Sequence, residues 1–97
     1  MNRAVFLDRD GVINRVTVRE GRPYAPIKLE DFVLLPGVPK AVESLRSGGF
    51  KVIIVTNQPD VATGVQRRDV VEAMHEYILS QTPIDAVFTC FHAQDGG

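Results

Sequence analysis

The sequence has few of the features that mark secreted or membrane-spanning chains. Its single cysteine, Cys90, excludes an intrachain disulfide, and a reducing compartment is the ordinary setting for such a chain. No apolar run approaches the roughly 18 residues that a membrane-spanning helix needs. The first residues form a short apolar run that Asp8 interrupts, which is unlike a signal peptide. We therefore expect a cytoplasmic protein with no membrane partner.

Neither sign of charge dominates the sequence. The 11 basic and 12 acidic residues give a formal net charge of −1, so nothing in the charge favours nucleic acid as a partner. Of the 97 residues, 44% are hydrophobic and 24% are charged, which is the balance of an ordinary globular protein. We therefore expect one domain over residues 1–97.

Strand and helix signals alternate along the chain. Residues 51–55 are a nearly continuous β-branched run, typical of a strand that is covered on both faces. A helix is predicted between Pro36-Gly37 and Gly48-Gly49, because apolar residues recur there at helical spacing. Further predictions are a strand at 4–7, a loop or small flap at about 12–35 in which a hairpin is an option, a helix at about 67–81 and a strand at 85–90. This order predicts an α/β fold with a parallel sheet.

Two carboxylates follow the first predicted strand in the segment FLDRDGV. Ligands of open parallel sheets bind beyond the carboxyl ends of the strands, where Asp8 and Asp10 fall. One carboxylate can attack phosphorus, and the other can protonate the leaving oxygen and then deprotonate water. Gly11 lets the backbone turn away and leaves room for a phosphate. A strand end followed by a polar turn is the alternative, and the position directly after a buried strand favours the catalytic interpretation.

A second polar pair, Thr56 and Asn57, follows the predicted strand at 51–55 in the segment VIIVTNQ. A hydroxyl and an amide there can donate hydrogen bonds to phosphoryl oxygens. Alone, such a pair is more often a turn. On a strand beside Asp8 and Asp10, it favours phosphate binding.

Together, the segments FLDRDGVIN, PGV and VIIVTNQ resemble the haloacid-dehalogenase (HAD) superfamily, in the branch of D,D-heptose 1,7-bisphosphate and histidinol-phosphate phosphatases. The resemblance implies a Rossmann-like, three-layer α/β/α fold with a parallel sheet, here the N-terminal part of it, truncated after the third strand. It implies that Asp8 is the nucleophile and a magnesium ligand. Asp10 would be the acid/base and would bind magnesium through its backbone carbonyl. Thr56 and Asn57 would bind the transferring phosphate.

The same resemblance suggests a zinc site. Cys90 and His92 match the first two ligands of a four-ligand zinc loop in this branch, with Phe91 in place of a proline. A structural zinc site needs four ligands, and no second cysteine follows. A strand cysteine and an exposed histidine are an equally good interpretation. His75, within the second helix, is expected to be structural or solvated.

Some parts that the resemblance implies are missing. No lysine or arginine follows Arg68, and no acidic pair follows Cys90 after a strand. Three strands would also leave a sheet edge unpaired and half of the apolar face uncovered. The segments 59–64 and 15–28 depart from the heptose-phosphatase pattern, which leaves the substrate open. We expect a longer, monomeric protein and little or no activity from residues 1–97 alone.

The leading hypothesis is therefore a magnesium-dependent phosphatase of the cytoplasm that hydrolyses a small phosphorylated metabolite. A sugar bisphosphate such as D-glycero-D-manno-heptose 1,7-bisphosphate is the expected substrate, which would place the protein in carbohydrate metabolism. Histidinol-phosphate phosphatase and polynucleotide 3′-phosphatase are alternative enzymes. A non-catalytic HAD-like fragment that binds phosphate, or that pairs with another chain through its sheet edge, is an alternative of a different class.

Overall fold

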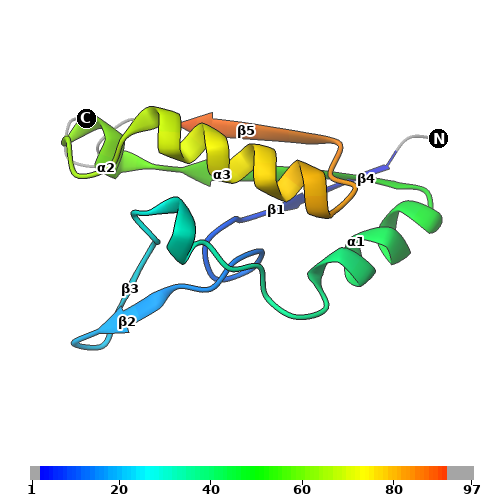
Figure 1. The fold of residues 1–97 in the computed structure, drawn as a ribbon. Helices are drawn as coiled ribbons and strands as arrows, with labels where there is room; N and C mark the ends of the chain where they lie inside the picture. The colour runs from blue at the N-terminus through cyan, green and yellow to red at the C-terminus, as the bar shows by residue number, and fades with distance from the viewer. Residues whose placement is uncertain (1–2, 92–97) are drawn as a thin grey trace.

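The computed structural model describes residues 3–91, and at its centre lies a parallel sheet in the strand order β1–β4–β5 (Figure 1). Central strand β4 pairs with β1, where Val5 lies opposite Val52, and with β5, where Val55 lies opposite Phe88. All strands point the same way, so the residues that follow them meet at one edge of the sheet. The strands are β1 Arg3–Leu7, β4 Phe50–Asn57 and β5 Ala86–Cys90.

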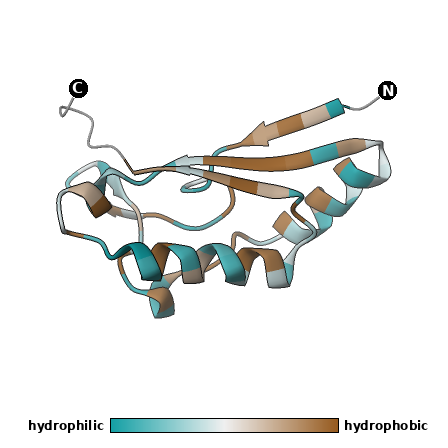
Figure 2. Cartoon of the chain, turned by 90° about the horizontal axis from the view of Figure 1, so that it is seen from above, coloured by the Kyte–Doolittle hydropathy of each residue, from teal (hydrophilic) through white to brown (hydrophobic). Residues whose placement is uncertain are grey.

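Helices α1 (Val38–Ser47) and α3 (Arg68–Gln81) cover the same face of this sheet (Figure 2). Right-handed crossovers from β1 to β4 and from β4 to β5 in one direction require this arrangement. The predicted helices and the parallel α/β order are confirmed. At 14 residues α3 is the longer of the two, and no helix in the described part of the chain could cross a membrane. The core between helices and sheet contains Val42, Val52, Ile54, Met74 and Ile78.

The opposite face of the sheet is open. Phe6, Val55 and Phe88, one from each strand, are 65%, 44% and 59% exposed. Strand alternation places them on the face turned away from the buried Val52 and Ile54. The described residues thus build two of the three layers of the expected fold, and the predicted uncovered apolar face is present.

The segment between β1 and α1 forms the predicted flap. Strands β2 (Thr17–Arg19) and β3 (Arg22–Tyr24) pair in an antiparallel hairpin that projects from the body of the protein (Figure 1). Its two turn residues, Glu20 and Gly21, have φ values of 52° and 76°, as a type I′ turn requires. The short 3₁₀ helix η1 (Leu29–Asp31) then leads back towards the core.

One buried glutamine fastens the flap to the body. The Gln66 amide donates to the carbonyl oxygens of Pro26 and Ile27 at 3.2 and 2.8 Å. Gln66 follows the four-residue helix α2 (Pro59–Ala62), which the sequence does not predict. The loops that carry the flap and α2 are therefore held together at the same end of the sheet.

The core contains one titratable side chain on the buried side of α3. His75 is 8% exposed, and its Nε2 lies 3.2 Å from Nη1 of Arg9. Burial, followed by the charge of Arg9, lowers the pKa of His75 from 6.5 to about 4, although Asp10 and Glu72 oppose the shift. His75 was expected to be either structural or solvated, and its burial supports the structural role.

We predict that His75 makes the stability of the protein depend on pH. Between pH 6.5 and about 4 the unfolded chain binds a proton at His75 that the folded chain does not, so the free energy of unfolding falls as the pH falls through this range. His75→Gln keeps an acceptor for Arg9 but does not titrate. Urea unfolding at a series of pH values should show that the wild type has the larger free energy of unfolding near pH 7, and that the difference from the variant decreases towards pH 4. A difference that stays constant would contradict the prediction.

Candidate functional site

The polar residues singled out in the sequence lie at the carboxyl ends of β1 and β4. Asp8 directly follows β1 and is exposed, and no side-chain hydrogen bond to its carboxylate is present among residues 3–91. Thr56 and Asn57 are the last residues of β4. Because Leu7 pairs with Ile54, the end of β1 lies beside these residues. The predicted meeting of the two motifs at one sheet edge is therefore present.

The loop after Asp8 closes tightly on itself. The carbonyl oxygen of Arg9 accepts a hydrogen bond from the Ile13 N–H at 2.7 Å, and the Gly11 N–H donates to the Asn14 carbonyl at 2.8 Å. Gly11 has a φ of +88°, a conformation that strains any residue with a Cβ. The glycine thus turns the backbone back, as predicted, and places Asn14 beside Asp10.

Three residues hold the carboxylate of Asp10. Arg9 donates to Oδ1 through Nη2 at 2.7 Å and Nε at 3.1 Å. Asn14 donates to the same oxygen at 3.0 Å, and Gln58 donates to Oδ2 at 2.9 Å. The side chain of Asp10 is 21% exposed, whereas that of Arg9 is fully buried. Asp10 is therefore fixed in orientation, while Asp8 is not.

The two residues predicted to bind phosphate differ in burial. Thr56 is 6% exposed, and its Oγ1 accepts from the Gln58 amide at 2.9 Å, which leaves its own hydroxyl proton available as a donor. Asn57 is exposed at the strand end. Strand alternation places Thr56 on the face of the buried Val52 and Ile54 and Asn57 on the opposite face, and both lie at the end of the sheet where Asp8 lies.

Sequence reasoning missed Arg9, Asn14 and Gln58 as members of the site. A signal for Arg9 was present: alternation along β1 places it on the same face as Val5 and Leu7, towards the helices, and Asp8 on the opposite face. No comparable local signal exists for Gln58, which meets Asp10 from 48 positions away.

The structure describes one of the two predicted zinc ligands. Cys90 is exposed at the end of β5, and its carbonyl accepts from the Gln58 N–H at 2.7 Å. His92 lies outside the described residues. Within residues 3–91, no group of three or more His, Cys, Asp or Glu side chains could hold a metal ion.

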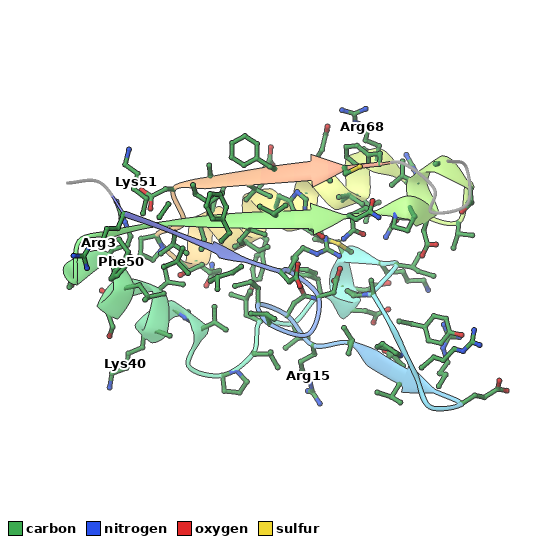
Figure 3. The ribbon with its side chains drawn as sticks, turned by 180° about the vertical axis from the view of Figure 1, so that it is seen from behind. Arg3, Arg15, Lys40, Phe50, Lys51 and Arg68 are labelled. Carbon is green, nitrogen blue, oxygen red and sulfur yellow. The ribbon has the colours of Figure 1, made fainter. Side chains whose placement is uncertain are left out.

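Three basic residues of the flap line a separate cavity. A cavity of about 530 Å³ is lined in part by Arg15, Arg19 and Lys28, and its lining includes neither Asp8 nor Asp10. Arg15 points away from the sheet (Figure 3). The structure therefore does not bring these cations together with the carboxylate pair.

Known proteins match nearly the whole length of this chain. No family model matches the sequence. A D-glycero-β-D-manno-heptose-1,7-bisphosphate 7-phosphatase from Rhodopseudomonas palustris is 37% identical over an alignment of 98 positions. The alignment covers 96% of this chain and 51% of the relative. The chain therefore spans about half the length of the curated relatives that it matches.

Solved structures agree with the sequence comparison. The D,D-heptose 1,7-bisphosphate phosphatase from B. bronchiseptica, complexed with magnesium and phosphate, superposes with a TM-score of 0.79 at 27% identity, over 98% of this chain and 53% of that one. A Mesorhizobium loti protein assigned as a HAD-like phosphatase gives 0.75 at 30% identity, over 92% of this chain and 42% of that one. With the resemblance carried by FLDRDGVIN and VIIVTNQ, the chain belongs to the HAD-like phosphatases, in the heptose 1,7-bisphosphate phosphatase branch.

Proposed function

We propose that this chain forms the nucleophile-bearing part of a phosphatase that acts on a small phosphorylated sugar. The observation that carries the proposal is the unequal setting of the two carboxylates. Asp8 is exposed at the sheet edge, as a nucleophile must be, whereas Asp10 is held by Arg9, Asn14 and Gln58. A pair with one free and one fixed carboxylate suits attack by the first and proton transfer by the second.

The proposed reaction has two steps. An oxygen of Asp8 bonds to phosphorus, the bond from phosphorus to the leaving oxygen breaks, and Asp10 gives that oxygen a proton. Water then attacks the aspartyl phosphate, Asp10 takes a proton from the water, and the bond between Asp8 and phosphorus breaks. Thr56 and Asn57 donate hydrogen bonds to the phosphoryl oxygens through both steps. Gly11, which has a φ of +88°, is expected to turn the backbone away and so leave room for the phosphate.

A magnesium ion fits the donors present. Asp8 offers a carboxylate with no side-chain partner among residues 3–91, and the backbone carbonyl of Asp10 would be the second ligand. Both are hard oxygen donors, and Mg²⁺ is commonly held by one or two carboxylates together with substrate phosphate and water. When bound, the ion would neutralise charge on the phosphate and on the nucleophile.

The proposed substrate is a sugar bisphosphate, with D-glycero-D-manno-heptose 1,7-bisphosphate as the first choice. Support comes from the names of relatives such as the Rhodopseudomonas palustris enzyme, a 7-phosphatase. We propose further that residues 1–97 are one portion of a single hydrolase domain, that the whole protein is a monomer of the cytoplasm, and that this portion alone has little or no activity.

The test uses the full-length protein. With magnesium present, it should release phosphate from heptose 1,7-bisphosphate, and Asp8→Asn should lower kcat by at least about 1,000-fold, because the amide cannot attack phosphorus. Phosphate release is the measurement. Asp69→Asn is the matched control and should keep the wild-type rate, since Asp69 is an exposed residue of α3 that pairs with Arg67 and accepts a hydrogen bond from the Val70 N–H.

Two results would overturn the proposal. One is the absence of phosphate release from a panel that includes heptose bisphosphate, histidinol phosphate and an oligonucleotide with a 3′-phosphate. The other is an Asp8→Asn variant that keeps its rate. A preference for histidinol phosphate or for the oligonucleotide would retain the mechanism and replace the substrate.

We also propose that Cys90 and His92 supply two ligands to a structural zinc ion whose other ligands lie elsewhere in the whole protein. The support is the exposed Cys90 thiol at the end of β5, together with the residue types, since thiolate and imidazole are ordinary zinc ligands. Elemental analysis of the native protein should find about one zinc ion per chain, and Cys90→Ala should lose most of it. A variant with undiminished zinc content would exclude the cysteine.

A further inference from the structure

The two carboxylate oxygens of Asp10 have different surroundings. Oδ1 accepts three hydrogen bonds, from Arg9 Nε and Nη2 and from Asn14 Nδ2. Among residues 3–91, Oδ2 accepts one, from Gln58 Nε2 at 2.9 Å. Because a carboxylate oxygen offers about two lone-pair directions, Oδ1 has none left and Oδ2 has one. The carboxyl group is partly exposed, so this remaining direction can face a substrate.

We propose that Oδ2 of Asp10 is the atom that gives and takes the proton, and that Arg9 and Gln58 are the positioning residues that make it so. The inference rests on the proposed phosphatase function. In the first step the proton leaves Oδ2 for the leaving oxygen as the bond from that oxygen to phosphorus breaks. In the second step a water proton returns to Oδ2 as the water oxygen bonds to phosphorus and Asp8 is released.

Arg9 can hold Oδ1 because its guanidinium is itself immobile. It is fully buried, and its Nη1 lies 3.2 Å from His75 Nε2 and 3.6 Å from Met74 Sδ. Its carbon Cζ lies 5.3 Å from the centre of the Phe32 ring. A side chain held on each of these sides cannot follow Asp10 if that residue rotates, so it fixes the rotation of the carboxylate.

The same contacts determine the form of His75. A guanidinium has only donors, so His75 Nε2 must accept the hydrogen bond from Arg9, and the ring proton must reside on Nδ1. That proton points to Thr89 Oγ1 at 3.4 Å. The neutral ring that its lowered pKa implies is therefore also the form that the geometry requires, and it ties Arg9 to β5.

Gln58 holds the second oxygen. Its Nε2 carries two protons, and these reach Asp10 Oδ2 and Thr56 Oγ1, each at 2.9 Å. Its backbone N–H donates to the Cys90 carbonyl, and the residue is only 4% exposed. Gln58 therefore links the proton-transferring oxygen to Thr56, one of the proposed phosphate ligands, and sets the position of Oδ2 relative to the phosphate.

The test compares two leaving groups in the native protein. An alkyl phosphate, such as the sugar phosphate, needs a proton on its leaving oxygen, whereas 4-nitrophenyl phosphate leaves as a stable anion. Since kcat/KM reports the first step alone, Arg9→Met and Gln58→Leu should lower kcat/KM for the alkyl phosphate by about 10- to 100-fold and leave that for 4-nitrophenyl phosphate within about threefold. The second step needs the base with either substrate, so kcat should fall for both.

Matched controls separate positioning from structure. Arg46→Met removes a half-exposed arginine near the amino end of β5, and Gln81→Leu removes an exposed glutamine at the end of α3. Both should keep the wild-type ratio of the two kcat/KM values. Arg9→Lys, which retains one charged donor, should recover part of the loss.

Each outcome is decisive. Equal losses of kcat/KM for the two substrates in Gln58→Leu, or no loss for either, would overturn the inference. If Arg9→Met does not fold, the Gln58→Leu comparison decides. A wild-type protein that releases phosphate from neither substrate would instead refute the proposed function, which is a different result from equal losses in the variants.

Discussion

The buried guanidinium of Arg9 joins the parts on which the site depends. Burying a charge away from water raises the free energy of the folded state unless polar partners surround the charge. Around the Arg9 guanidinium these partners are Asp10, His75, Met74 and the ring of Phe32. These partners come from the loop after β1, from α3 and from the segment after η1. The carboxyl end of the sheet, its covering helix and the base of the flap therefore pack around one cation, so Asp10 is oriented by the core itself.

The architecture could be predicted because it depends on local patterns. The β-branched run at Lys51 to Val55, the apolar periodicity of α3 and the glycines around α1 each identify an element within about 15 residues. Helix α2 was missed because four residues carry no periodicity. Within the site, the motif identified Asp8 and Asp10, but the residues that orient Asp10 were not predicted. Arg9 and Asn14 contact Asp10 from one and four positions away, and strand alternation gave a local signal for Arg9. The contacts of Gln58 with Asp10 and of Arg9 with His75 join positions 48 and 66 apart, and a single sequence does not record such contacts.

The open face of the sheet explains why the fold is recognisable although only two of its layers are described. Strand register and the α1 and α3 crossovers define the parallel sheet without help from the other face. Phe6, Val55 and Phe88 then remain as exposed apolar side chains on one face that a third layer would bury. The chain spans about half of its curated relatives, which leaves ample length in those proteins for such a layer.

Charge compensation is the part of the proposed chemistry that the described residues do not supply. In the proposed reaction a phosphate monoester would approach Asp8 with close to two negative charges, and the carboxylate of Asp8 would add another. Arg9 is the cation adjacent to Asp8, but its guanidinium is buried and directed at Asp10, so it cannot also bind the phosphate. Thr56 and Asn57 are neutral donors. In the proposed reaction the compensating charge would therefore come from a metal ion held by Asp8 and from cations other than Arg9, and the contribution of the described residues would be to set the two carboxylates in separate roles.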